Sequence, residues 1–306
     1  MVPDMGSMDV HIPDLPSDVH HAVCMGDNQA LVIGDNGDDR VSVVLTLLSD
    51  GTIESEAPQP CPIPVTLAHY RVVRVGNDVY AYGGIDLADK TTRNDMYLYT
   101  ADTGQWSAVH KTGLWPPPLL STSAFCINGT LYLAGVGSNP GPWQLWSYTV
   151  ADGWVESSVP DGVRLGGVHG VATIGDTVYV LQSGSTMHII TEDGRSLCFY
   201  RVSGMPGRLQ SVVGWEHGLL ATSRYRRHYQ GPTAVRSDYV YDRVSGERSQ
   251  AQPTGWGDIH THTYSDQPCC LIGPSTALCI WNTGDRPPRV MVRDLEPERE
   301  TECERE

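Results

Sequence analysis

The chain has 306 residues, among them 32 glycines and 21 prolines, and a net charge of −15. This charge excludes a general nucleic-acid binder, which needs surplus Lys and Arg to neutralise phosphates. The longest apolar-leaning run, residues 41–48, is far too short to cross a bilayer, and residues 1–16 lack the basic and apolar regions of a secretory signal. We therefore expect a cytoplasmic protein that binds neither nucleic acid nor membrane.

The eight cysteines form no CxxC pair and no disulfide-framework spacing. Several of them fall inside apolar runs, where cysteine behaves as a small buried hydrophobe. The sequence therefore predicts reduced thiols, as in the cytoplasm, and it predicts no cofactor.

Six similar units follow a first strand-like piece at residues 8–12. Each unit contains two short apolar runs joined by a tight turn, often an Asn-Gly or Gly-Asp pair that tolerates positive φ. The second run recurs about every 50 residues. Its positions are marked by Val32, Tyr80, Tyr132, Tyr179, Leu220 and Cys279.

The unit at residues 76–106 shows the pattern most fully. Two aromatic-rich runs, Val79–Tyr82 and Met96–Thr100, have the composition of half-buried strands. Gly83-Gly84 ends the first run, at a place where backbones approach closely or φ is positive. A turn at residues 102–104 follows the second run, and Trp106 opens a further strand.

This order of strand, Gly-Gly, loop, Tyr-bearing strand, turn and Trp resembles a kelch repeat. Gly104-Gln105-Trp106 and Gly153-Trp154 match the Gly-before-Trp element of that family, and Gly34, Gly135 and Gly184 stand where other units keep a single glycine. The resemblance implies an all-β, six-bladed β-propeller with four-stranded blades, and five or seven blades are the alternatives. The blades are expected at roughly 18–60, 66–113, 119–160, 166–204, 208–254 and 260–295.

The two ends of the chain complete this arrangement. Residues 1–7 are expected to be flexible, and residues 296–306 form an acidic tail expected to be disordered. The last unit lacks an obvious fourth strand, whereas residues 8–16 are a spare one. We therefore predict that the N-terminal piece supplies the outer strand of the last blade and closes one domain over residues 8–295.

Loops on one propeller face are the expected binding site, because a rigid scaffold holds them in place. The longest such loop carries Arg224, Tyr225, Arg226, Arg227, His228 and Tyr229. Arginine binds carboxylate or phosphate through two parallel bonds, and tyrosine adds rigid apolar area. The companion loops contain Asp86 and Trp143. The alternative interpretation is that these arginines pair with acids of neighbouring blades.

Two groups of histidines are candidates for a metal site and for a structural role. His260 and His262 point to one side of an extended segment and are compatible with two imidazole ligands of a metal, but a metal site needs a third ligand and a polar loop is the favoured interpretation. His21, His69 and His169 recur near the start of the first strand of their units, which favours a structural role such as bonding to a neighbouring blade.

The sequence as a whole favours a non-catalytic interaction module. It predicts a monomer that binds a protein or peptide, acidic or phosphorylated, by its loop face. Kelch propellers also include enzymes, so the alternative is a sugar mutarotase-like or metal-dependent oxidase- or lyase-like enzyme with its site in the central channel. The sequence contains no GxSxG, HExxH or P-loop motif.

Overall fold

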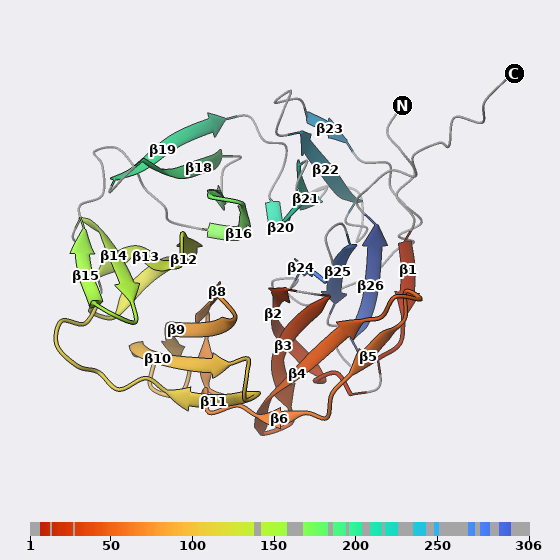
Figure 1. Cartoon of the computed structure of the whole chain (residues 1–306), viewed down its shortest axis with the longest axis horizontal. Coiled ribbons are helices and arrows are strands. Elements are labelled where there is room, and N and C mark those ends of the chain that lie inside the picture. Colours follow the sequence, from red (N-terminus) through yellow and green to blue (C-terminus); the bar gives the residue numbers. More distant parts are fainter. Residues whose placement is uncertain are drawn as a thin grey trace, which may run out of the picture.

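The computed structural model describes most of the chain, and within it all regular structure is β-strand. The strands stand around one axis as a β-propeller (Figure 1). The described ranges are 7–12, 14–26, 28–137, 142–157, 168–182, 186–193, 196–203, 209–215, 218–225, 235–242, 248–250, 269–272, 276–281 and 288–294.

Within these ranges the strands form six antiparallel sheets, numbered here in the order in which their innermost strands occur along the chain. The first sheet contains β2 (Asp18–Gly26), β3 (Gln29–Asn36), β4 (Asp39–Leu47), β5 (Ile53–Ser55) and β6 (Gln59–Pro60). The second contains β7 (Leu67–Ala68), β8 (Arg71–Val75), β9 (Asp78–Asp86), β10 (Thr92–Thr100) and β11 (Gln105–Ala108). The third contains β12 (Leu119–Ile127), β13 (Thr130–Gly137), β14 (Trp143–Thr149) and β15 (Gly153–Ser157).

The remaining sheets repeat the same meander from the axis outward. The fourth contains β16 (Val168–Ile174), β17 (Thr177–Gln182), β18 (Thr186–Asp193) and β19 (Ser196–Ser203). The fifth contains β20 (Leu209–Trp215), β21 (Gly218–Tyr225), β22 (Val235–Asp242) and β23 (Arg248–Gln250). The sixth contains β24 (Cys269–Leu271), β25 (Thr276–Trp281), β26 (Arg289–Asp294) and β1 (Ser7–Val10).

The innermost strands form a closed ring. Each of β2, β8, β12, β16, β20 and β24 contacts the next, and β24 contacts β2 again. The N-terminal strand β1 lies at the outer edge of the sixth sheet and pairs with β26, with Met8 opposite Val292 and Val10 opposite Val290. The pairing predicted for the N-terminal piece is therefore confirmed.

The tight turns follow the sequence pattern. At Asn128-Gly129 both residues have positive φ, 49° and 75°, and Ile127 pairs with Thr130 on either side. A two-residue hairpin of this kind needs positive φ at both central positions, because only that twist matches the twist of the strands.

The hydrophobic core lies between sheets, and the second strands β3, β9, β13 and β17 each contribute to two neighbouring clusters. In β3, Leu31 and Ile33 pack with the second sheet, whereas Ala30 and Val32 pack with the sixth. Successive side chains of a strand point to opposite faces, so a strand between two sheets is apolar at every position. This explains the continuous apolar runs by which the second strands were recognised.

Candidate functional site

The two ends of the propeller have different connections. Every sheet is a meander that starts at its innermost strand, so the connections between second and third strands lie at one end with the connections between sheets. We call this end the loop face. The opposite end, where first strands turn into second strands and third into fourth, is the turn face.

The predicted binding residues lie at the loop face as far as the structure describes them. Asp86 ends β9, Trp143 begins β14, and Arg224 and Tyr225 end β21. Trp143 is partly buried and packs against the cluster between the third and fourth sheets. Arg226, Arg227, His228, Tyr229, His260 and His262 lie outside the described residues.

The β9–β10 connection is held by ion pairs within itself. Arg93 Nη2 lies 2.7 Å from Asp86 Oδ2 and 2.7 Å from Asp89 Oδ2. Thr91 donates to Asp89 through its hydroxyl at 2.6 Å. The hydrogen bond from Arg93 holds the pKa of Asp86 below its ordinary value. Arg93 therefore pairs with acidic residues, but these belong to its own loop and not to a neighbouring blade.

Two apolar side chains are exposed here, one in this loop and one on the segment next to it. Val65 and Leu87 keep 40% and 49% of their surface exposed. They lie on segments that are joined directly, because the Leu87 amide donates to the Thr66 carbonyl at 2.8 Å. We call these two residues the Val65–Leu87 patch.

A buried arginine fixes the backbone under this patch. Arg40 is 4% exposed and donates from Nε to Asp35 Oδ1 at 2.6 Å. Its other nitrogens donate to the carbonyls of Val65 and Leu67, each at 3.1 Å. Burial alone would raise the pKa of Asp35, but its hydrogen bonds with Arg40 and His20 together hold that pKa below the ordinary value. Arg40 of the first sheet is therefore hydrogen-bonded to the segment that leads into the second sheet.

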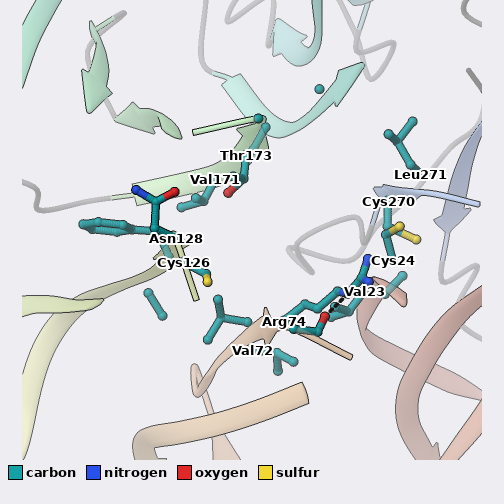
Figure 2. Close-up of a pocket in the computed structure, with 18 residues that line it drawn as sticks. Val23, Cys24, Val72, Arg74, Cys126, Asn128, Val171, Thr173, Cys270 and Leu271 are labelled. Atoms are coloured by element: carbon teal, nitrogen blue, oxygen red, sulfur yellow. Dashed lines mark hydrogen bonds between the residues drawn. The ribbon is translucent and has the colours of Figure 1, made fainter. Parts of the chain in front are cut away.

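The channel contains a cavity of about 450 Å³, whose described lining comes mainly from the second halves of the innermost strands (Figure 2). It therefore lies toward the turn face. Most of its lining is small and apolar. The polar and sulfur-bearing residues of that lining include Cys24, Cys126, Cys270, Asn128, Thr173 and Arg74.

The chemistry available in this cavity is limited. Burial raises the pKa of Cys126, so its thiol stays protonated near neutral pH and is a poor nucleophile. Arg74 donates to the Gly76 carbonyl at 2.6 Å and is the one charged residue in the described lining. Among the residues that the structure describes, no group of three His, Cys, Asp or Glu is placed to hold a metal ion.

The recurring histidines take different positions near the loop face. The His21 ring packs against the Tyr70 ring with centroids 4.5 Å apart. Burial, and then the charge of Arg71, lower the pKa of His21 well below its ordinary value, so this histidine is neutral at pH 7. His69 is exposed and has a φ of 57°. The sequence offered no sign of this difference, because both follow the same spacing.

Comparison with known proteins supports the fold and leaves the family open. No family model matches the chain, and no curated protein matches it. A solved structure titled "Structure of YjhT" superposes with a TM-score of 0.62 at 13% identity, covering 91% of this chain and 99% of that one. No helix in the described part of the chain is long and apolar enough to span a membrane. The topology and this likeness together make the chain an all-β propeller.

Proposed function

We propose that the chain is a six-bladed, kelch-type propeller and that it is a non-catalytic interaction module. The six sheets of the described residues and the ring of innermost strands support the blade number. The Gly83-Gly84 pair supports the kelch resemblance, because both glycines have positive φ, 67° and 107°.

The observation that carries this proposal is the Val65–Leu87 patch on a rigid frame. Its backbone is tied by Arg40 from below and by the ion-paired β9–β10 loop from the side. Exposed apolar side chains rimmed by ordered polar groups are the anatomy of a protein-binding site. A rigid site also loses little conformational entropy on binding.

The partner is a protein or peptide with acidic or phosphorylated side chains, bound by a cytoplasmic monomer without a cofactor. The Arg-rich sequence of residues 224–229 supports this chemistry, since its first two residues end β21 at the loop face and arginine recognises carboxylate and phosphate. In this arrangement the patch takes an apolar side chain of the partner while the arginines take its charges.

The test measures binding of acidic and phosphorylated peptide libraries to the purified protein. Leu87→Ser should weaken binding of selected peptides by about fivefold or more, the effect of losing an interface anchor. Reversing Arg226 and Arg227 to Glu should abolish binding. Val150→Ser is the matched control, because Val150 is 80% exposed but lies in the β14–β15 connection at the turn face.

Two results would contradict the proposal. Equal losses of binding in Leu87→Ser and Val150→Ser would show that exposed apolar side chains contribute to binding whether they lie at the loop face or at the turn face. Unchanged binding in both the Leu87 and the Arg226/Arg227 variants would remove the loop face as the binding site.

An enzyme acting in the channel is the second candidate, favoured by the cavity of about 450 Å³, a volume within the range of ligand pockets. Its described lining of alkyl groups, one aromatic ring, thiols, the Asn128 amide, the Thr173 hydroxyl and one guanidinium supplies no pair of groups for acid and base catalysis. Saturable binding of a sugar that is lost in Arg74→Gln would favour the enzyme over the interaction module.

A further inference from the structure

The innermost strands each place one residue at the same level of the channel. In each of the six sheets this residue pairs with the second residue of the second strand. We call the set the channel ring, and all of its members line the cavity toward the turn face. They are Cys24, Arg74, Cys126, Thr173, Gly214 and Leu271.

The ring members face the channel because successive side chains of a strand point to opposite sides. Ile127 and Ile174 follow two of them and are buried between sheets, at 1% and 7% exposure. Cys126 and Thr173 themselves keep exposed surface. Arg74 is the one charged member, and most of the others are small, so the ring leaves room beside the arginine.

Two backbone segments set the position of the Arg74 guanidinium. Its Nε donates to the carbonyl of Gly76 in the same sheet at 2.6 Å. A Cβ built on Gly26 would lie 2.8 Å from Nη2 and 3.1 Å from Nη1, so the guanidinium lies against the backbone of the first sheet. Figure 2 shows this side chain running from β8 toward Cys24. The absence of a side chain at Gly26 makes room for it.

Arg74 has no acidic partner among the residues that the structure describes. The described ion pairs involve other basic residues, and the hydrogen bond that Arg74 donates uses Nε. Both Nη nitrogens are therefore available as donors. Arginine holds a carboxylate through two parallel N–H···O bonds, and such an ion pair is stronger where apolar walls exclude water. The cavity thus contains a positioned group for one carboxylate.

The rest of the described lining suits an apolar ligand. It consists largely of alanine, valine and cysteine side chains together with the ring of Phe125. Few other polar side chains are present, and the Asn128 amide already donates to Glu192 at 2.6 Å. A ligand with many hydroxyl groups would lose its hydrogen bonds to water without replacing them. The cavity volume of about 450 Å³ is within the range of small-molecule pockets.

We propose that the turn end of the channel binds a small monocarboxylate whose body is alkyl or aromatic. The two Nη groups of Arg74 bind the carboxylate, and the apolar lining contacts the body. Because Gly76 and Gly26 hold the guanidinium in place before the ligand arrives, little conformational freedom is lost on binding. The ligand is bound without chemical change, and the site is independent of the interaction proposed for the loop face.

The experiment titrates octanoate into the purified protein and follows the heat of binding. The wild type should bind octanoate saturably. Octanamide has the same chain without the charge, and gluconate has the carboxylate on a hydroxylated body. Each should bind at least about tenfold more weakly, octanamide because it lacks the ion pair and gluconate because its hydroxyls are left without partners.

Variants of Arg74 locate the carboxylate. Arg74→Gln should weaken octanoate binding by about tenfold, the usual loss for a charge-assisted hydrogen bond. Arg74→Lys keeps the charge but not the fork, so its affinity should lie between those of Arg74→Gln and the wild type. Lys111→Gln is the matched control, because it removes one positive charge at an exposed position of the β11–β12 connection. It should bind within about twofold of the wild type, since distant exposed charges are screened.

A variant that leaves Arg74 intact tests where the apolar body lies. Thr173→Phe fills part of the channel ring from an exposed position and should weaken octanoate binding. Thermal melts check that each variant is folded, and if Arg74→Gln does not fold, Thr173→Phe and the octanamide comparison still test the site.

Four results would overturn the proposal. They are the absence of saturable octanoate binding, equal losses in Arg74→Gln and Lys111→Gln, unchanged binding in Thr173→Phe, and tighter binding of gluconate than of octanoate. The last result would favour a sugar site in the channel instead.

Discussion

The two ends of the channel are built from the same strands yet differ in regularity and charge. At the turn face, β8 passes into β9 through a tight turn, and the described lining of the cavity has one charged residue, Arg74. At the loop face the ladders slip, a histidine has positive φ, and a buried arginine that is ion-paired within the first sheet also bonds to the backbone of the second. At the turn face the described first strands pair regularly except for one shift between Cys24 and Gly26 in β2, whereas shifts in four of the innermost strands lie at the loop face.

Opening the ring should disturb both ends and produce the largest effect. Removing residues 1–16 deletes β1 together with the buried side chains of Ile12 and Leu15. Their burial contributes about 5 kcal/mol, so the melting temperature should fall by about 10 °C or more. Thermal unfolding followed by circular dichroism measures this change.

Deletion of residues 1–6, which leaves β1 intact, is the control and should melt like the full chain. If the 1–16 deletion also melts like the full chain, the N-terminal strand does not close the ring.

Breaking the buried ion pair should affect the loop face more selectively. Arg40→Met leaves the Asp35 carboxylate without its main partner and frees the carbonyls of Val65 and Leu67. Removing one member of a buried pair costs about 3 kcal/mol or more in unfolding free energy, measured in urea. The double variant with Asp35→Asn should be less unstable than Arg40→Met alone, because no buried charge remains. A double variant that is less stable than the single one would contradict this account.

Two glycine substitutions in one sheet compare the ends directly. Gly84→Ala, at the loop face, places a methyl group 2.7 Å from a backbone oxygen at a φ of 107° and should cost about 2 kcal/mol or more. Gly76→Ala, at the turn face, has a φ of 63° and no atom within 4 Å, so it should cost only about 1 kcal/mol. Equal unfolding free energies for the two variants would mean that close approach of the strands is not what requires Gly84.

Acid should weaken the loop face in two small steps. The depressed pKa of His21 means that the unfolded chain takes up a proton first, so stability falls as the pH drops below about 6.5. The depressed pKa of Asp35 contributes stability that is complete above about pH 4 and is lost as the pH falls through the lower folded-state value. Urea midpoints at successive pH values measure both steps. His21→Phe should remove the first step and Asp35→Asn the second, and a step that persists in its own variant belongs to another group.

The sequence was sufficient for the strands and turns because each depends on local pattern, and for the pairing of the N-terminal piece because the last unit lacked a strand and residues 8–16 were spare. Apolar runs such as Ala30–Ile33 predict strands buried on both sides, and Asn128-Gly129 predicts its hairpin directly. The contacts at the loop face were not predictable in this way. Arg40 bonds to the carbonyl of Leu67, 27 residues away, and no periodicity encodes such a contact.

The histidines show the same limit. His21 and His69 occupy equivalent places in the repeat, and the structural role expected for both suits the ring of His21 against Tyr70. The exposure of His69 accompanies a break in pairing between β7 and β8 opposite Gly84, and predicting that break requires knowing how two strands pair. The Arg-rich loop of residues 224–229 remains a prediction.

The pairing of β1 with β26 has a consequence for how the chain acquires its fold. Strand β1 completes a sheet whose neighbouring strand is made almost 300 residues later, so the ring cannot seal until residues 289–294 have left the ribosome. Contacts so distant in sequence form slowly. During that interval the pairing edge of β1 and the apolar face of β2 have no cover, which makes sealing the last step of folding and the one most exposed to aggregation.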